Sequence, residues 1–234
     1  MKTRALAPPA AGRQTPHRQR RAAEILAAAR EVFLDKGFER ASVAEVAARV
    51  GVVEGLVYGY FPTKRELLDQ VLQGLYRPLI QDIEAGFSRL QGLRSRLRFL
   101  IWRHIRVYAE EPGLSRIVLH ELRTGPEYFQ SALHGLQVEY TRFLIRTLQE
   151  AKDGGELPPD TDAEMVRSLV YGGIEHHLWA TLFGRGQVDV EATADRYTAL
   201  VLQGIQARGS DTESRLARLE QWVARAAPKP RRAR

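Results

Sequence analysis

The chain has 234 residues, a hydrophobic fraction of 44% and a formal net charge of +7, and it contains no cysteine. The length allows one small and one larger domain, while the missing cysteines exclude disulfide bonds and thiolate chemistry. The sequence has no run of about 18 apolar residues that could span a membrane, and no signal-peptide core at its start. We therefore expect a cytoplasmic location and no membrane partner.

The positive charge is concentrated at the two ends of the chain. Residues 1–21 carry six cations and no acid, and residues 228–234 carry four, so subtracting six and four from +7 leaves a net charge of −3 between them. Basic arms suit phosphate contact and insertion into the minor groove of DNA. We expect a flexible basic arm at residues 1–17; the alternative is that the charged ends are solvated and only aid solubility. The candidate DNA contacts beside this arm are Arg18, Arg20 and Arg21.

The first predicted helix begins at His17 or Arg18 and ends at Lys36. Its apolar residues recur every three or four positions, which is the spacing of one buried helical face. Gly37 follows, and glycine after a helix favours the left-handed backbone that ends it. The residues expected on the inner face are Ala22, Ile25, Leu26, Ala29, Val32 and Phe33.

Residues 42–64 carry the pattern of a helix-turn-helix followed by the start of another helix. Ser42 can cap the first of these helices, and Gly51 follows it where a sharp turn needs a left-handed backbone. Val57 gives the second short helix a buried side, so its opposite side is exposed. An exposed short helix on a compact support fits the major groove of DNA. The outward residues are expected to be Val53, Glu54, Leu56, Tyr58 and Gly59.

The next predicted helix begins at Thr63, whose hydroxyl can cap it, and Glu66 three residues later completes the pattern of a capping box. Pro78 lies inside this helical run and predicts a kink or a break near Tyr76 and Arg77. A proline at this point is a candidate hinge between two domains, and a merely bent helix is the alternative.

Beyond this helix the sequence has only helical periodicity, interrupted by the glycine- and proline-rich residues 153–159. No strand pattern longer than a few residues occurs, so the predicted fold class is all-α. We expect a three-helix DNA-binding domain at residues 18–64, a larger helical domain at residues 65–208, and a possible extra helix with a basic tail at residues 209–234. Further helices are expected at residues 93–110, 112–123, 126–151, 161–183 and 190–208.

Residues 51–67 contain the motif Gly51-Val52-x-x-Gly55-x-Val57-Tyr58-x-Tyr60-Phe61-Pro62-Thr63-Lys64-x-x-Leu67. This motif resembles the signature of TetR-type transcriptional regulators, and residues 25–38 resemble the first helix of that family. The resemblance implies an N-terminal helix-turn-helix domain that binds double-stranded operator DNA. It also implies a C-terminal helical domain that binds a small molecule and forms a homodimer.

The resemblance assigns phosphate contacts to polar groups that bracket the second short helix. Hydroxyl groups, a helix N-terminus and an ammonium group all complement phosphate oxygens. Tyr60 is either one of these contacts or a core residue. The residues implied are Ser42, Tyr58, Tyr60 and Lys64, and Gly55 and Thr63 complete the predicted DNA-binding set.

The base-reading positions depart from the family pattern. The chain has Val53, Glu54, Leu56 and Gly59 there, so few hydrogen-bond donors face the bases. Apolar side chains can pack on thymine methyl groups, while the carboxylate of Glu54 repels nearby phosphates. Specificity would then depend more on methyl contacts, DNA shape and the basic arm than on bidentate hydrogen bonds.

The larger predicted domain is rich in aromatic residues with few polar groups among them, which suits a small-molecule pocket. Aromatic residues at helical spacing are also what a plain core contains. Residues 114–123 and 172–175 are similar to the branch of the family that answers to fatty acyl thioesters, and this similarity implies a small lipophilic effector. The candidate ligand-binding residues are Trp102, Tyr108, Glu121, Phe129, Tyr140, Phe143, Ile174, His177 and Trp179.

His176 and His177 raise the question of a metal site. Adjacent residues on a helix point about 100° apart, and neither histidine has a histidine or carboxylate four residues away. A polar pocket residue or an interface residue is the favoured interpretation, so no metal or cofactor is predicted. The chain has no glycine-rich phosphate loop, no nucleophile elbow and no paired acids at catalytic spacing, so no enzyme is predicted either.

The two helices expected at residues 161–183 and 190–208 are the candidate dimer helices. Paired glycines at positions 172 and 173 would let helices approach closely across a two-fold axis. The interface residues expected are Val170, Gly173, Leu178 and Leu182. The function predicted is that of a ligand-responsive homodimeric repressor; the alternatives are a helical dimeric small-molecule-binding protein with weak or no specific DNA binding, and a small-molecule enzyme.

Overall fold

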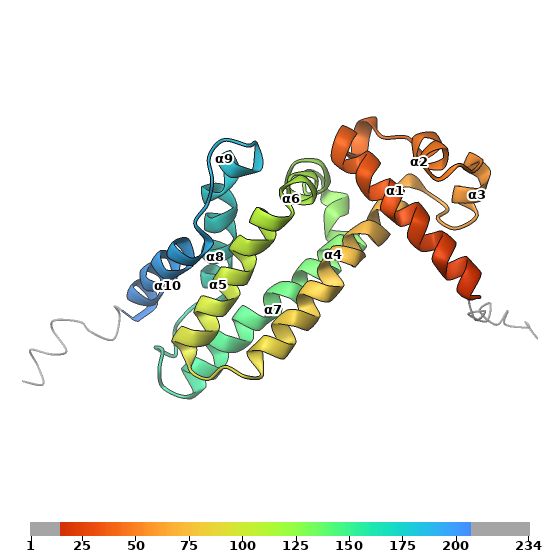
Figure 1. Ribbon diagram of the computed structural model, residues 1–234. Coiled ribbons are helices and arrows are strands. Elements are labelled where there is room, and N and C mark those ends of the chain that lie inside the picture. Colours follow the sequence, from red (N-terminus) through yellow and green to blue (C-terminus); the bar gives the residue numbers. More distant parts are fainter. Residues whose placement is uncertain (1–14, 207–234) are drawn as a thin grey trace, which may run out of the picture. The chain divides into compact units, whose positions relative to one another are not determined.

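The computed structural model describes residues 15–206, and every regular element within that range is a helix (Figure 1). The predicted all-α fold class is therefore confirmed. The described residues form two compact units: unit 1 contains residues 15–75 and 117–128, and unit 2 contains residues 76–116 and 129–206. Residues 1–14 of the predicted basic arm and the possible extra helix with its basic tail lie outside the described residues, whereas Pro16 and His17, expected in the arm, are the first residues of a helix.

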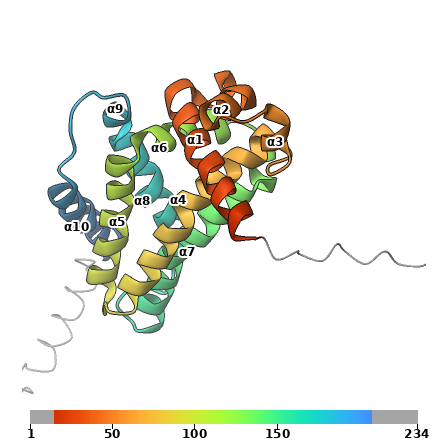
Figure 2. The ribbon, with the colours of Figure 1, turned by 45° about the vertical axis from the view of Figure 1, so that its right-hand side comes forward.

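Unit 1 is built from α1 (Pro16–Arg40), α2 (Val43–Val50), α3 (Glu54–Tyr58) and the first half of α4 (Lys64–Phe87). Helix α1 is interrupted where the sequence predicts its end, because Gly37 has a non-helical backbone with φ 77° and ψ 170°. Figure 2 shows α1, α2 and α3 grouped around the start of α4, and each of these helices contributes buried apolar side chains. The most buried of them are Ile25, Ala29, Phe33, Val46, Val57, Leu67, Leu68 and Leu72.

Helix α4 carries the chain from unit 1 into unit 2 and continues through Pro78 without a break. Of the kink or break predicted near Tyr76 and Arg77, the break is thus wrong, and the kink stays a prediction. Proline removes a hydrogen bond to the carbonyl of the residue four positions earlier, which here is Gly74. Both Gly74 and Pro78 are exposed, so the freed carbonyl faces water and the helix tolerates the proline.

Unit 2 is a helical bundle arranged around α5 (Leu93–Glu110), as predicted. Helix α5 packs against α7 (Ala132–Asp153), α8 (Ala163–His177) and α10 (Val190–Gln206), and Figures 1 and 2 both show α10 beside α5. The guanidinium of Arg98 on α5 donates to Asp195 at 2.6 Å and to Glu191 at 2.8 Å, and this pairing raises the pKa of Arg98. The two short helices of unit 2 are α6 (Pro112–Ile117) and α9 (Trp179–Leu182).

Three predicted helix boundaries in the second half of the chain are wrong. The helix expected at residues 112–123 changes to a π-helix at Val118–Leu122. The helix expected from residue 126 starts as a 3-10 helix, Pro126–Gln130, and α7 begins only after Ser131, whose hydroxyl accepts from the backbone N–H of His134. The helix expected at residues 161–183 divides at Leu178 into α8 and α9. Within residues 15–206 no helix is long and apolar enough to cross a bilayer.

Candidate nucleic-acid interface

Helix α2 begins with a complete capping box. The hydroxyl of Ser42 accepts from the backbone N–H of Glu45, and the Glu45 carboxylate accepts from the backbone N–H of Ser42 at 3.1 Å. Lys36 on α1 also donates to Glu45, and this side-chain hydrogen bond is the first cause of the lowered pKa of that carboxyl. The cap by Ser42 was predicted, while the part of Glu45 was missed although the Ser42-x-x-Glu45 spacing signals it.

The turn and the short helix α3 have the geometry of a helix-turn-helix. Gly51 has a left-handed backbone with φ 72°, as the sequence predicts, and Val57 is fully buried beneath α3. The opposite side of this helix is open to solvent. Val53 is 76% exposed, Leu56 40% and Tyr58 42%, so three of the predicted base-reading or phosphate-contacting side chains are accessible to solvent. Glu54 and Gly59 are exposed as well. That these residues contact DNA stays a prediction.

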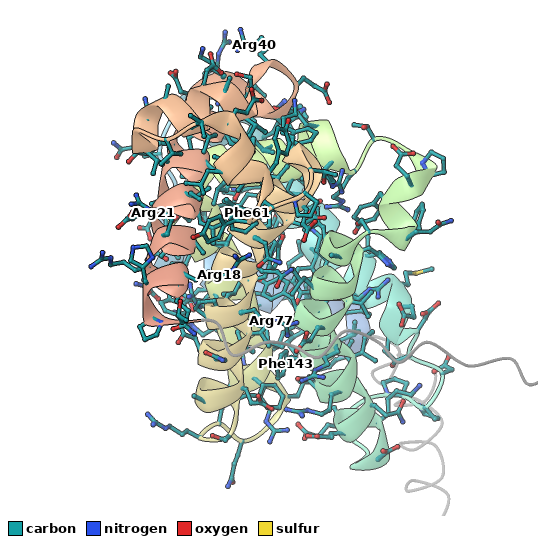
Figure 3. All side chains as sticks on the ribbon, turned by 90° about the vertical axis from the view of Figure 1, so that its right-hand side faces the viewer. Arg18, Arg21, Arg40, Phe61, Arg77 and Phe143 are labelled. Atoms are coloured by element: carbon teal, nitrogen blue, oxygen red, sulfur yellow. The ribbon has the colours of Figure 1, made fainter. Side chains whose placement is uncertain are left out.

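Arg18 holds the first turn of α1 against the end of α3. Its guanidinium donates to the backbone carbonyl of Gly59 at 3.1 Å and lies 4.6 Å from the ring centre of Tyr60. Tyr60 is half-buried, so it is neither a fully buried core residue nor a freely exposed one. Arg18 and Arg21 lie in the first half of α1, at the opposite end from Arg40 (Figure 3). Arg21 pairs with Glu24 at 2.7 Å.

Thr63 and Lys64 both act on the protein's own backbone. The hydroxyl of Thr63 accepts from the backbone N–H of Glu66 at 3.0 Å, which is the predicted cap of α4. The ammonium group of Lys64 donates to the backbone carbonyls of Phe38, Glu39 and Ala41 and lies over the Phe38 ring. An ammonium group has three hydrogens to donate, and these three carbonyls engage all of them.

Glu121 was predicted to bind the effector, and the structure places it elsewhere. It lies on the π-helix in unit 1, where its carboxylate accepts from the backbone N–H of Phe38 at 2.6 Å and of Glu39 at 3.3 Å. The sequence carries no signal for this contact, because the partners are more than eighty positions apart. Glu121 therefore holds the backbone of unit 1.

Unit 2 contains a buried polar group among its aromatic residues. His104 is buried on α5 with its Nδ1 2.9 Å from the hydroxyl of Tyr140, and its ring meets those of Tyr108 and Tyr171 edge-on. The Tyr108 hydroxyl donates to Glu175 at 3.2 Å. We call these five residues the His104 cluster. Burial raises the pKa of Tyr140 well above its ordinary value of 10 and also raises the pKa of Tyr171, so both hydroxyls remain protonated donors.

The structure separates the predicted ligand-binding residues into three groups. One group is buried inside unit 2 and consists of Tyr108, Tyr140, Phe143 and Ile174. Burial is compatible both with a pocket wall and with a plain core. Trp102 instead donates its indole N–H to Glu191 at 2.6 Å and fastens α5 to α10. The side chains that are exposed are Phe129, His177 and Trp179, so these three do not join the buried group. Sequence reasoning missed His104, whose signal was a histidine on the apolar face of a helix.

A groove of about 460 Å³ lies on unit 2 between α7 and α8. Its floor includes Val138 and Ile145, and its rim carries three guanidinium groups and two carboxylates. Arg167 pairs with Glu164 at 2.9 Å, whereas Arg142 lies against the Phe143 ring. The charged rim residues are Arg142, Arg146, Arg167, Glu150 and Glu164.

The predicted dimer residues are buried inside the protomer. Val170, Leu178 and Leu182 are each less than 5% exposed, and the carbonyl of Gly173 accepts from the Tyr197 hydroxyl at 3.0 Å. The three buried side chains therefore point into the protomer, whereas Gly173 is half-buried. The helix α8 has apolar residues on two faces, and periodicity alone does not tell which one is internal. The exposed apolar residues of α8 and α10 are Met165 (60%), Leu169 (65%) and Leu200 (66%).

His176 and His177 are both exposed at the end of α8. Among residues 15–206, no three histidines or carboxylates lie close enough together to hold a metal ion.

A capped helix-turn-helix with an accessible second helix, joined to a separate helical bundle with a buried polar cluster, defines a helix-turn-helix DNA-binding regulator. Residues 25–71 match the family model described as bacterial regulatory proteins, tetR family, and residues 91–205 match the tetracyclin repressor-like C-terminal domain. The chain belongs to the TetR family. It is accordingly a ligand-responsive DNA-binding transcriptional regulator.

The similarity to known relatives extends over nearly the whole length of those proteins. The chain is 22% identical over 182 residues to the fatty acid metabolism regulator protein of Bacillus subtilis, covering 78% of this chain and 94% of that protein. It is 24% identical over 200 residues to the HTH-type transcriptional repressor KstR2 of Mycobacterium tuberculosis, covering 81% and 94%. The crystal structure of FadR from Bacillus subtilis in complex with stearoyl-CoA has a similar fold, with a TM-score of 0.70, 23% identity, and coverage of 78% of this chain and 98% of that one.

Proposed function

We propose that the protein is a homodimeric transcriptional repressor of the cytoplasm. It binds a near-palindromic operator through two copies of unit 1 and is released when unit 2 binds a small lipophilic effector of the fatty acyl thioester class. The observation that carries this proposal is the helix-turn-helix itself: a capped α2, the left-handed turn at Gly51, and a short α3 whose Val53, Leu56 and Tyr58 are exposed, as a major-groove reader needs. The activity is binding and regulation, with no catalytic step.

The DNA-binding surface combines phosphate contacts with apolar base contacts. The N-terminus of α2 and the hydroxyl of Tyr58 suit phosphate oxygens, because both present hydrogen-bond donors and the helix end carries partial positive charge. Val53 and Leu56 suit thymine methyl groups, since both side chains are exposed and apolar. Arg20, whose side chain is 73% exposed, is the cation of α1 best placed to reach a phosphate. Phosphate contacts therefore supply affinity, while methyl contacts and DNA shape supply sequence preference.

The effector site belongs to unit 2. The His104 cluster supplies hydrogen-bonding groups inside an otherwise apolar bundle, which is the character of a pocket that orients a lipophilic molecule. The arginine-rimmed groove between α7 and α8 supplies guanidinium groups that suit an anionic head group. The acyl thioester class is supported by the similar fold of FadR from Bacillus subtilis, which was solved with stearoyl-CoA.

The dimer face replaces the one expected from the sequence. Met165 and Leu169 lie four positions apart and therefore project from one side of α8, and Leu200 is exposed on α10. Gly172 lies one turn beyond Leu169, and a Cβ added there would meet no atom within 4 Å, so this stretch can accept a close partner helix. A two-fold dimer would place the two α3 helices about 34 to 36 Å apart, which is one turn of DNA.

The rival function is that of a helical dimeric binding protein that reads DNA poorly. The observation that favours it is the absence of side-chain donors at Val53, Leu56 and Gly59. Fluorescence anisotropy with the DNA upstream of the gene, with a shuffled duplex of equal length, and with and without stearoyl-CoA separates the two. Tighter binding to the upstream DNA, reversed by stearoyl-CoA, supports the repressor. Equal binding of both duplexes, unaffected by stearoyl-CoA, supports the rival.

A further inference from the structure

Residues 37–41 comprise the last turn of α1, which follows the interruption at Gly37, and the C-cap Ala41. We call them the connection to α2, and their backbone is held by side chains from two other parts of the chain. The N–H groups of Phe38 and Glu39 donate to the carboxylate of Glu121. Their carbonyl oxygens accept from Lys64. Backbone groups outside regular hydrogen-bonded helices need such partners, and here charged side chains supply them on both sides. The connection is thus clamped rather than free to rearrange.

The approach of Glu121 depends on the absence of a side chain at residue 37. Gly37 has φ 77°, and a Cβ at this position would lie 2.7 Å from Oε1 of Glu121. A glycine is needed twice, once for its backbone conformation and once for the close contact. The Glu121 carboxylate can therefore reach the backbone of this connection only because residue 37 is glycine.

Glu121 comes from a segment that the chain inserts into unit 1. The chain leaves unit 2 after Arg116, forms the π-helix Val118–Leu122, and returns to unit 2 at Phe129. The π-helix follows α6 directly in the chain, so a displacement of α6 would act on it through the covalent backbone. A π-helix is a local irregularity in helical register that is frequent at functional sites.

The clamped connection leads directly to the cap of α2. Ser42 follows Ala41, and its hydroxyl and N–H form the capping box that fixes the N-terminus of α2. A shift in the connection would move the end of α2 that is expected to face phosphate. Glu121 thus lies between the segment inserted from unit 2 and the helix end that is expected to face phosphate.

We propose that Glu121 is a positioning residue for operator binding. It holds the connection between α1 and α2 in the arrangement that binds DNA, and it makes that arrangement depend on the state of unit 2. This inference rests on the proposed function, because it takes operator DNA and an effector as the two ligands. Glu121 itself touches neither ligand.

The test compares Glu121→Ala, Glu121→Gln and the control Glu127→Ala, which removes an exposed carboxylate from the same inserted segment. Operator affinity is measured by fluorescence anisotropy at several salt concentrations, with and without stearoyl-CoA, and thermal unfolding of each variant is recorded in parallel. Glu121→Ala should weaken operator binding by about tenfold, within the usual range of coupling between sites. The slope of log affinity against log salt should not change, since no phosphate contact is lost.

Further results distinguish positioning from plain stability. Stearoyl-CoA should reduce the operator affinity of Glu121→Ala by a smaller factor than that of the wild type, because the clamp it releases is already absent. Glu121→Gln keeps one acceptor oxygen, so its operator affinity should lie between those of Glu121→Ala and the wild type. The operator affinity of Glu127→Ala should match that of the wild type. Gly37→Ala should weaken operator binding independently, and less so in the Glu121→Ala background, because the carboxylate that its Cβ would meet is gone.

Two results would overturn the proposal. One is Glu121→Ala binding the operator as tightly as the wild type. The other is a loss of stearoyl-CoA binding with operator affinity unchanged, which would make Glu121 an effector ligand. If the wild type binds no operator at all, the proposed function fails rather than the role of Glu121. The wild-type measurement therefore distinguishes failure of the proposed function from failure of this inference.

Discussion

The ammonium nitrogen of Lys64 lies 2.8 Å from the backbone carbonyl oxygen of Phe38 and 4.5 Å from the centre of its ring. Two further carbonyls, of Glu39 and Ala41, lie within hydrogen-bonding distance of the same nitrogen. The sequence motif assigns this lysine to DNA phosphate, but its hydrogens are engaged by the protein itself. Lys64 therefore ties the start of α4 to the end of α1.

The first prediction concerns Lys64→Ala. Loss of three hydrogen bonds to backbone carbonyls should lower the free energy of unfolding by roughly 1–2 kcal/mol and weaken DNA binding. The slope of log affinity against log salt should remain that of the wild type, because no phosphate contact disappears. In the control Arg20→Ala the slope should fall by about 0.9 if that exposed cation neutralises one phosphate. A similar fall in the slope for Lys64→Ala would show that Lys64 contacts a phosphate after all.

The second prediction concerns the acid stability of unit 1. Lys36 and the backbone N–H of Ser42 hydrogen-bond to Glu45 and hold its pKa below the ordinary 4.5. A lowered pKa in the folded state means that the charged carboxylate stabilises the fold above pH 4.5, and that this contribution is lost as the pH falls through the folded pKa. Glu45→Gln should therefore be less stable than the wild type at neutral pH, with a difference that shrinks in acid.

Thermal unfolding of the wild type and Glu45→Gln at a series of pH values measures this difference. A gap in melting temperature that stays constant from neutral pH down to below pH 4 would contradict the assigned role of the carboxylate.

The third prediction separates base reading from phosphate contact on α3. Leu56→Ala should reduce the preference for operator over random DNA by about tenfold, similar to the cost of one mismatched base pair. Tyr58→Phe removes only a hydroxyl and should weaken both duplexes alike. Competition binding with both duplexes provides the measurement. Equal losses on operator and random DNA for Leu56→Ala would remove Leu56 from the base-reading set.

The fourth prediction concerns the dimer face. Leu169→Arg places a charge in the centre of the exposed apolar surface of α8, so it should shift the protein to a monomer. Ser95→Arg adds the same charge at an exposed position on α5 and should leave the dimer intact. Light scattering after size-exclusion chromatography reports the mass. A dimer that survives Leu169→Arg would place the interface elsewhere.

Local signals predicted the DNA-binding unit well. The cap at Ser42, the left-handed Gly51 and the burial of Val57 each depend on neighbours within a few residues, and all are found. Helix α5 was predicted with its observed bounds because its apolar spacing is regular and Pro112 follows its end. Local sequence patterns were therefore enough to predict the helix-turn-helix and the bounds of α5.

The errors have a different origin. Ser131 caps α7, but its side chain was not recognised as a helix start inside a long amphipathic run. Helix α8 offered two apolar faces, and the internal one was chosen for the dimer. Glu121 and Lys64 were assigned to ligands because no local pattern reveals their backbone partners. The partners of Glu121 are 82 and 83 positions away, and those of Lys64 are 23 to 26 positions away.

The mass of the protein–DNA complex shows whether two copies of the helix-turn-helix bind one operator together. Native mass spectrometry of the full chain with the duplex upstream of its gene, at low ionic strength, gives the number of chains per duplex. We expect chains to add to the duplex in pairs, and we expect Leu169→Arg to abolish these complexes. Complexes with one wild-type chain per duplex, or no complex at all, would rule out paired binding.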